Sequence, residues 1–427
     1  MNHDISFSIF FRRLRHSYLY FYFFVMILFA ARAVNITGSM VYYTGNIVSF
    51  LIPIILTIIL LRKYPISFKC KELTATLIVI SLWFICQFIK YKSLNASLTF
   101  YLYYAIFIAY VHIKVYGWKI VRFYEDIVAH LSIFSLIGWG MQIVFPSLIN
   151  SVMLFSSSAG TISGSSLIYS AGRDYSEAIV FFRNAGFSWE PGMFASLLLI
   201  GIFFNLLLTR MNLGIKANKK LYMMLFALIT TQSTTGFGCF MIIGSLSYLY
   251  SYKSKIKWLL VVLLIPMSTW IYSLPFMGEK INTLWVNDRK ELVEQYQEKL
   301  EYIKSGIALT RFQALSLELY NIEHDPIIGY GRDDNQSYVV QNIFKFGLPN
   351  GVLKVFAKYG IPLGIIFYIL LFKFSLMLSI KYRYKCSYAF FVLYCLISVS
   401  YSFIESPIFL SFTLFPLFVR KHACIKK

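Results

Sequence analysis

The amino-acid sequence predicts an all-α, polytopic membrane protein with about twelve transmembrane helices and two large extracytoplasmic loops. Three observations support this fold class. Hydrophobic residues make up 58% of the chain and gather in separate runs long enough to cross a bilayer. Lys and Arg residues fall in every second gap between these runs, and two of the remaining gaps are long. The pattern predicts a single integral membrane domain over residues 1–427.

The predicted spans follow from length, because a helix needs about twenty mostly apolar residues to cross the hydrocarbon core. They lie at residues 17–34, 45–62, 73–89, 98–113, 124–145, 193–209, 221–235, 237–252, 257–275, 352–372, 386–403 and 406–419. Ala31-Arg32-Ala33 after the first run resembles a signal-peptide cleavage site. That run is longer than a usual signal core, which favours an uncleaved anchor.

The charge of the gaps predicts the side that each gap faces. Lys and Arg gather before the first span and after every even-numbered span, whereas residues 35–45 and 234–238 carry no charge. By the positive-inside bias, the basic gaps and both termini lie in the cytoplasm. Membrane orientation therefore accounts for much of the formal net charge of +21, and we predict no nucleic-acid partner.

Two extracytoplasmic gaps are much longer than the others, at residues 146–192 and 277–351. Loops longer than about fifteen residues are usually functional or disordered, so we place the chemistry in these two. The first begins with a Ser/Gly-rich stretch at residues 156–166, whose composition is typical of a flexible linker. It ends at Glu190 and Pro191, which suit a helix start, because Pro fits the first turn and a carboxylate complements the helix dipole.

Basic side chains in these loops are candidates for a site. Arg183 lies near the membrane surface on the side where basic residues do not serve orientation, so we interpret it as an anion-binding residue. The second loop adds Arg311, His324 and Arg332 around a turn that Pro and Gly residues structure at positions 323–335. Guanidinium groups from both loops could bind one phosphate, for which Arg is well suited. His324 precedes Asp-Pro and also has the simpler interpretation of a turn residue.

Other features of the second loop have structural interpretations. Residues 288–304 predict an amphipathic helix with its carboxylates on a solvated face, and a second helix follows at about residues 308–320. Asp333 and Asp334 could attract a hard cation, but no further carboxylate follows in register. This favours a turn or a helix cap, and we predict no metal site.

Three runs carry a resemblance to a known family. Residues 311–315 and 324–331 read RFQAL and HDPIIGYG, residues 183–191 read RNAGFSWEP, and Asn350 precedes two spaced glycines. They are similar to the R-x-x-x-[WL], H-P-[LI]-x-G-x-G and R-x-x-G-[LF]-x-x-E-P segments, and to the opening of the tenth span, in the O-antigen polymerase and ligase superfamily. The resemblance covers roughly the second half of the chain.

Two departures from the superfamily pattern bear on function. The ligases carry a His directly before the Asn, where this chain has Pro349, so the resemblance favours a polymerase over a ligase. The superfamily often has Ser-Arg between its two middle spans, whereas residues 230–236 read TTQSTTG and lack that charge.

The resemblance implies a GT-C-like glycosyltransferase of the bacterial inner membrane whose active site faces the periplasm. Such an enzyme would transfer a growing glycan from undecaprenyl diphosphate to the non-reducing end of another lipid-linked repeat unit. The leaving group is already activated, so we expect no metal and no other cofactor. The implied partners are the lipid-linked oligosaccharides, membrane lipid, a chain-length regulator and a flippase.

This reaction requires groups that stabilise charge on the leaving diphosphate and orient the acceptor hydroxyl. We assign Arg183 and Arg311 to the diphosphate, and either Glu190 or His324 to the hydroxyl as a base. The further substrate-binding candidates are Arg173, Arg332 and Asn350.

A transporter, such as a flippase for lipid-linked oligosaccharides, is the non-enzymatic alternative. Transporters tend to have internal repeats, short loops and interrupted spans. This sequence shows no convincing repeat, and its long loops lie on one side. Ionisable residues are also scarce at the span centres, which argues for an enzyme.

Overall fold

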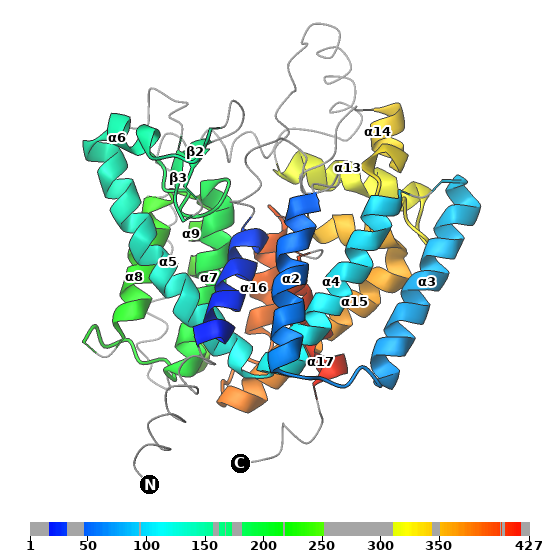
Figure 1. The fold of residues 1–427 in the computed structure, drawn as a ribbon, viewed down its shortest axis with the longest axis horizontal. Coiled ribbons are helices and arrows are strands. Elements are labelled where there is room, and N and C mark those ends of the chain that lie inside the picture. Colours follow the sequence, from blue (N-terminus) through cyan, green and yellow to red (C-terminus); the bar gives the residue numbers. More distant parts are fainter. Residues whose placement is uncertain are drawn as a thin grey trace, which may run out of the picture. The chain divides into compact units, whose positions relative to one another are not determined.

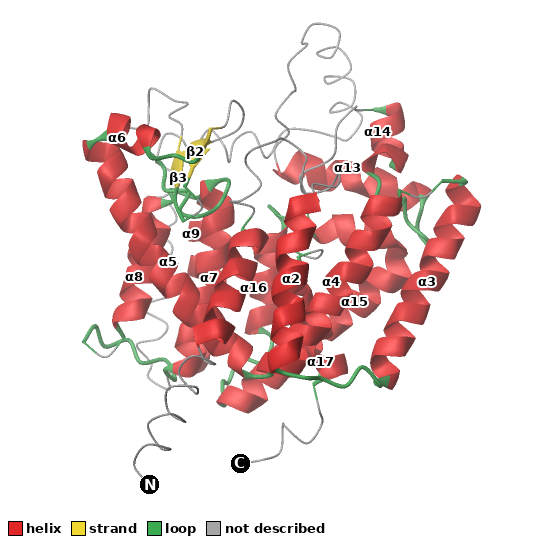
Figure 2. Ribbon diagram, viewed as in Figure 1, coloured by secondary structure: helices red, strands yellow, loops and turns green. Residues whose placement is uncertain are grey.

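The computed structural model describes residues 17–31, 47–93, 95–156, 162–166, 168–172, 182–216, 218–251, 311–343, 351–401, 403 and 406–419. Helices form most of this structure, and the strands in it are short (Figures 1 and 2). The chain divides into two compact units. Unit 1 comprises Met1–Cys70, Ile106–Gly236 and Phe418–Lys427, and unit 2 comprises Lys71–Ala105 and Phe237–Leu417.

Unit 1 is built on three helices that pack against one another, α5 (Lys119–Val144), α7 (Pro191–Leu208) and α8 (Lys219–Thr230). α7 is apolar all round and almost entirely buried, as expected of a central helix. The unit also contains a helix at Ser17–Ala30, α2 (Ile47–Lys63), the second half of α4 (Ala96–Tyr116), α6 (Pro146–Ser151) and the start of α9 (Thr234–Ser251).

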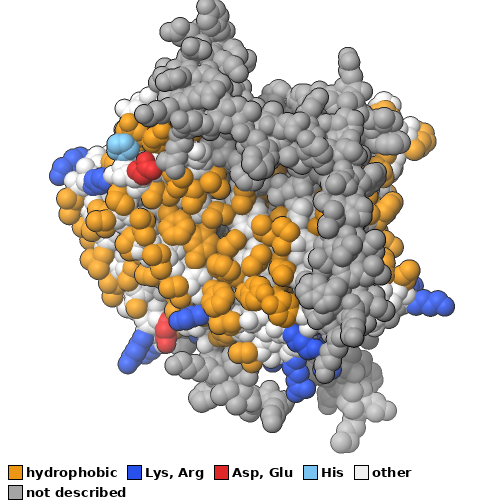
Figure 3. All heavy atoms as spheres, turned by 180° about the vertical axis from the view of Figure 1, so that it is seen from behind, with side chains coloured by type: hydrophobic (Ala, Val, Ile, Leu, Met, Phe, Trp, Pro, Cys, Tyr) orange, Lys and Arg blue, Asp and Glu red, His pale blue; other side chains and the backbone are white. Residues whose placement is uncertain are grey.

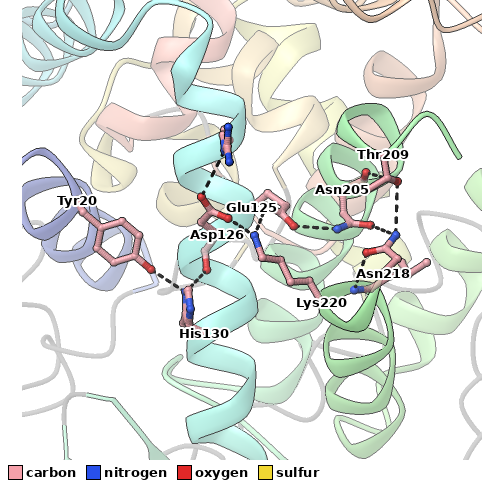
Figure 4. Close-up of polar contacts among 10 residues, drawn as sticks. Tyr20, Glu125, Asp126, His130, Asn205, Thr209, Asn218 and Lys220 are labelled. Atoms are coloured by element: carbon pink, nitrogen blue, oxygen red, sulfur yellow. Dashed lines mark hydrogen bonds and ion pairs between the residues drawn. The ribbon is translucent and has the colours of Figure 1, made fainter. Parts of the chain in front are cut away.

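A buried polar network joins the three central helices of unit 1 (Figure 4). Glu125 on α5 accepts a hydrogen bond from Asn205 Nδ2 on α7 at 2.8 Å, and it pairs with Lys220 Nζ on α8 at 3.2 Å. Asn218, which caps α8, donates to Asn205 Oδ1 at 2.7 Å, and Lys220 also pairs with Asp126. The buried carboxylate of Glu125 is thus compensated by an amide and an ammonium group, so the network stabilises the helix contacts.

The first long loop folds into a small antiparallel sheet. Its strands β1 (Phe155–Ser156), β2 (Ile162–Ser165) and β3 (Ser170–Gly172) pair in chain order. Tyr169 fixes the sheet to α5, because its ring packs on Gly138, where a Cβ would lie 2.5 Å from the ring. Its hydroxyl donates to Gln142 Oε1 at 2.5 Å, and Gln142 Nε2 donates to the carbonyl of Gly172 at 2.8 Å.

The prediction of a flexible linker at residues 156–166 is therefore wrong for Ile162–Ser165. The reason is that α5 supplies hydrogen bonds and a packing surface, which a Ser/Gly-rich composition does not reveal.

Unit 2 is organised around α15 (Val352–Tyr382), a long helix that is broken at Gly360. α13 (Arg311–His324) packs against α15, and α14 (Tyr338–Asn342) packs against α13 and the short 3-10 helix η2 (Asp334–Gln336). The unit also contains α3 (Lys71–Tyr91), the first half of α4, most of α9, α16 (Ala389–Ser398) and α17 (Pro407–Phe418). Phe374, Phe390 and Phe412 pack together where α15, α16 and α17 meet.

Each predicted span that falls in the described residues contains a helix. Of the helices that the structure describes, five are long and apolar enough to cross a membrane: Lys71–Tyr91, Leu98–Tyr116, Lys119–Val144, Pro191–Leu208 and Val352–Tyr382. The count of twelve spans stays a prediction. The span at 257–275 and the amphipathic helix at 288–304 lie outside the described residues.

Among the described residues that Figure 3 shows, hydrophobic side chains cover most of the surface, and Lys and Arg side chains lie at its margins. On α3, Leu82, Ile85 and Ile89 are each more than half exposed, and Ile366 on α15 is exposed to a similar degree. A bilayer accommodates such surfaces, because lipid tails replace water around apolar side chains.

Candidate active site

Arg183 is bound to the end of α8. Its Nε donates to the carbonyl of Thr231 at 3.3 Å, and its Nη2 donates to the carbonyl of Gln232 at 3.2 Å. These carbonyls follow the last turn of α8, where helix carbonyls lack intrahelical partners and a cation is favourable. The polar segment at residues 230–236, which lacks the Arg of the family pattern, thus receives a guanidinium group from the first loop.

The residues after Arg183 hold the same loop in place. Asn184 is fully buried, and its Nδ2 donates to Thr230 Oγ1 at 2.9 Å while its backbone N–H donates to the Thr230 carbonyl at 3.0 Å. Asn184 Oδ1 accepts from the N–H of Gly186 at 2.8 Å. Sequence analysis missed Asn184, although an Asn beside a turn glycine is a recognisable signal for such a side-chain bond.

Glu190 ends this loop as the N-cap of α7, and the prediction that Pro191 begins a helix is confirmed. The Glu190 side chain is 8% exposed and makes no capping hydrogen bond to α7. The hydroxyl of the neighbouring Ser188 is buried and has no hydrogen-bond partner among the residues that the structure describes. The structure therefore places Arg183 and Glu190 on one short, well-anchored loop of unit 1.

The turn at residues 325–332 in unit 2 is bound on one side by α3. Asp325 forms an ion pair with Lys90 and accepts a hydrogen bond from the Tyr91 hydroxyl at 2.6 Å. Gln87 Nε2 donates to the carbonyls of Ile328 and Gly329, both at 2.9 Å. Residues 325–331 of the HDPIIGYG run thus form a fixed turn, as their Pro and Gly content predicted.

On its other side the turn bonds to the broken part of α15. Pro362 has no N–H for the carbonyl of Lys358, which instead accepts from the N–H of Gly331 at 3.0 Å. The carbonyl of Ala357 accepts from the N–H of Tyr330 at 2.9 Å, while Ile361 donates to the carbonyl of Pro326 at 2.7 Å. The helix and the turn therefore exchange backbone partners at the break, so that these groups stay hydrogen-bonded.

Gly360 makes this exchange possible. Its φ is +78°, and a Cβ there would lie 1.9 Å from the carbonyl oxygen of Ile327. Only glycine adopts this conformation at low cost and leaves room for the turn. Gly360, the first of the two spaced glycines that follow Asn350, therefore has a defined structural reason.

Arg332 is buried beside α4. It is 5% exposed, its Nη1 donates to the carbonyl of Leu98, and its Cζ lies 4.9 Å from the centre of the Tyr101 ring. These contacts fasten the end of the turn to α4, which gives Arg332 a structural role in this conformation.

His324 and Arg311 lie at opposite ends of α13. The predicted helix at about 308–320 is observed at Arg311–His324, so His324 closes the helix instead of lying in the turn. Its exposed imidazole stacks on the Tyr338 ring, with centroids 3.5 Å apart and planes at 17°. The helix rises 1.5 Å per residue, so the Cα atoms of the two residues lie about 20 Å apart.

The structure does not describe the side chains of the remaining predicted site residues. Arg173 and Asn350 lie outside the described residues, and for Arg311 the backbone alone is described. Their roles stay predictions. Asp333 is the N-cap of η2 and accepts from the N–H of Asn335 at 3.1 Å, which confirms the cap interpretation.

Sequence analysis missed a buried charged cluster in unit 2. Lys354 and Lys358, one turn apart on α15, pair with the Asp334 carboxylate at 3.1 and 3.3 Å. Glu318 on α13 lies close to all three charges and is fully buried. Burial raises the pKa of Glu318 to about 7, against the opposing effects of Lys354 and of the hydrogen bond from Asn321. The sequence signal was present, since both lysines lie on the side that the charge pattern predicts to be extracytoplasmic, where basic residues are scarce.

Residues 221–368, about a third of the chain, match the family model described as O-antigen ligase. The matched range contains α13, the turn at 325–332 and the outer part of α15, whereas Arg183 and Glu190 precede it. No curated protein matches the chain.

Proposed function

We propose that the chain is a member of the O-antigen polymerase and ligase superfamily, whose family model residues 221–368 match, and that it is a polymerase of polysaccharide repeat units. It transfers a glycan from undecaprenyl diphosphate to the non-reducing end of another lipid-linked repeat unit. The reaction takes place at the periplasmic face of the bacterial inner membrane. A chain-length regulator and a flippase would work beside it.

The chemistry needs two kinds of group. The acceptor hydroxyl attacks the anomeric carbon and forms the new C–O bond, the bond from that carbon to the diphosphate oxygen breaks, and the hydroxyl proton passes to a base. Donors aimed at the departing oxygen stabilise its charge, and one such donor is typically worth about 3 kcal/mol at the transition state. We assign this task to Arg183 and Arg311, with Arg173, Arg332 and Asn350 as substrate-binding candidates, and no metal.

The observation that supports the proposal most is the anchored turn at residues 325–332, which lies in the range that matches the family model. The turn at residues 325–332 is held by α3 on one side and by the break in α15 on the other, so its position is fixed before any substrate binds. Fixed supports are what a glycosyl transfer site needs, because small misplacements lose much of the rate.

The candidates for the base are Glu190 and His324, and the length of α13 bears on the choice between them. His324 lies about 20 Å along the helix from Arg311. If Arg311 binds the leaving diphosphate, His324 cannot also act at the same anomeric carbon. That arrangement favours Glu190 as the base and leaves His324 to contact a more distant sugar.

A polymerase is favoured over a ligase because Pro349 stands where the ligases carry His. The test is to mix the purified protein with a detergent-solubilised lipid-linked repeat unit. We expect a ladder of longer glycans from the wild type and from Lys216→Ala, which changes an exposed cytoplasmic-side residue, and no ladder from Arg183→Ala or Arg311→Ala. Transfer that requires lipid A core would instead indicate a ligase, and lipid movement across vesicles without a new glycosidic bond would indicate a flippase.

A further inference from the structure

Two lysines at the start of α15, Lys354 and Lys358, are largely buried. Their side chains are only 12% and 7% exposed. They begin α15 on the side predicted to be extracytoplasmic, where Lys and Arg do not serve membrane orientation. Burying ammonium groups is costly, so a pair of them in one place calls for a reason other than topology.

Both ammonium groups meet a single carboxylate that reaches the surface. Asp334 Oδ2 lies 3.1 Å from Lys354 Nζ, and Asp334 Oδ1 lies 3.3 Å from Lys358 Nζ. The Tyr330 hydroxyl also donates to Asp334 Oδ1, at 3.2 Å. The Asp334 side chain is 39% exposed, far more than either lysine. Three donors therefore converge on two oxygens of one surface anion, which is the pattern by which proteins bind phosphate oxygens.

A buried acid beside this group points to a ligand. Glu318 is 1% exposed, and its Oε2 accepts a hydrogen bond from Asn321 at 2.9 Å. Its Oε1 has no hydrogen-bond partner among the described residues, although it is buried. Buried polar atoms in native proteins are nearly always paired, so this oxygen lacks a partner that another molecule would supply. A protonated carboxyl can donate a hydrogen bond to an anion.

We infer that Lys354, Lys358 and Tyr330 form an anion-binding site for the diphosphate group of a lipid-linked saccharide, with Asp334 as its internal occupant. The inference rests on the proposed function in one respect, the identity of the lipid. Polymerisation uses two lipid diphosphates for each new bond, and one of them stays on the acceptor. Arg183 and Arg311 are assigned to the diphosphate that leaves, and the lysine site holds the one that stays.

The direct test measures binding and does not depend on glycosyl transfer. Farnesyl diphosphate and inorganic pyrophosphate are titrated into the purified full-length protein in detergent, by calorimetry. We expect the double variant Lys354→Gln/Lys358→Gln to bind farnesyl diphosphate at least tenfold more weakly. The matched control is Lys373→Gln, an exposed lysine on the same helix, which should bind as the wild type does.

Asp334→Asn separates a ligand site from a purely structural ion pair. If Asp334 competes with the ligand, its neutral replacement should bind farnesyl diphosphate about fivefold more tightly. If the lysines serve only to pair with Asp334, the variant gains nothing and the inference fails. Thermal unfolding of each variant, together with Lys354→Arg, which keeps the charge, distinguishes lost binding from lost folding.

Two further arms identify the source of the diphosphate. Phosphatidylglycerol in nanodiscs should not displace farnesyl diphosphate, and displacement by it would make this a headgroup site and overturn the acceptor assignment. In the ladder assay, the double lysine variant should need more of an acceptor that carries the diphosphate, and no more of an alkyl glycoside acceptor without it. Lysine-dependent binding without any ladder would leave the site standing and refute the polymerase instead.

Discussion

At the scale of single residues, Glu318 is a buried carboxyl outside the predicted spans, and its burial and its charged neighbours shift its pKa. It faces Lys354 and Lys358 of α15 and Asp334 of η2, and its own helix supplies Asn321. Burial raises the pKa of its carboxyl from 4.5 to about 7, so the folded protein keeps a proton that the unfolded chain has already lost in this range.

This difference predicts a pH dependence of stability. Below pH 4.5 both states hold the proton, and above pH 7 both have lost it, so the change falls between these values. The free energy of unfolding should fall by about 3 kcal/mol from this group as the pH rises through that window. Thermal unfolding in detergent at pH 5 and pH 8 measures it, and Glu318→Gln should flatten the difference. An equally steep dependence in the variant would assign it to other groups.

Residue type decided which site residues the sequence could reveal. Arg183 stood out because it lies near the predicted membrane surface where Arg does not serve orientation, and the neighbours of Arg183, Glu190 and His324 resemble a family motif. Lys354 and Lys358 also lie where basic residues do not serve membrane orientation, but they are lysines and have no guanidinium group to suggest bidentate phosphate binding. The engagement of Arg183 by two carbonyls could not be predicted, because Thr231 and Gln232 are distant in sequence and carry no signal for it.

At the scale of elements, the break in α15 predicts a severe effect for Gly360→Ala. The methyl group would meet the Ile327 carbonyl, and φ of +78° is unfavourable for alanine, so the turn at 325–332 should separate from the helix. We expect a loss of at least about 2 kcal/mol in the free energy of unfolding. Gly140→Ala in α5 is the control, because nothing lies within 4 Å of its added methyl group.

Limited proteolysis provides a second readout for this variant. Cleavage near residues 325–332 should become much faster in Gly360→Ala and should not change in Gly140→Ala. Unchanged proteolysis together with unchanged stability would show that the exchange of backbone partners at the break contributes little.

The network in Figure 4 predicts strong coupling between helices α5 and α8. Lys220→Met leaves the buried Glu125 carboxylate without its ammonium partner and should cost about 3 kcal/mol of unfolding free energy. Glu125→Gln in the same chain should recover much of this loss, because the uncompensated charge is then removed. A double-mutant cycle by thermal unfolding checks it, and additive losses would mean that the pair is not coupled.

Elements differed in how far the sequence could predict them. Long apolar runs marked the helices well, and the cap at Asp333 followed from residue type. The strands β1 to β3 could not be predicted, because Ile162–Ser165 is short and rich in small residues. The sheet is held by Gln142 of α5 and by Tyr169, which lies later in the loop. The end of α13 was placed four residues too early, because Glu323 and His324 are polar but still complete a helical turn.

At the scale of the whole molecule, the charge pattern of the gaps predicts orientation. Ser151, at the end of α6, should face the periplasm, and Lys216, between α7 and α8, should face the cytoplasm. In a chain whose six native cysteines are replaced by serine, an impermeant maleimide added to spheroplasts should label Ser151→Cys directly. It should label Lys216→Cys only after permeabilisation, and the reverse result would invert the topology.

The fold class was predictable because hydrophobic length and charge placement are imposed by the bilayer itself. The residues that share a site were less predictable, because convergence depends on contacts between segments far apart in sequence. The turn at 325–332 shows this, since Gln87 and Ala357, which bind it, are separated by most of the chain.

The backbone hydrogen bonds between the turn at residues 325–332 and α15 couple the positions of the two segments. A side-chain contact can adjust by rotation about its χ angles, whereas a hydrogen bond between two backbone groups passes a displacement of one segment directly to the other. Three backbone hydrogen bonds join α15 to the turn at residues 325–332, so a displacement of α15 around Gly360 would act directly on that turn. The position of the motif residues 325–331 is thereby coupled to that of α15.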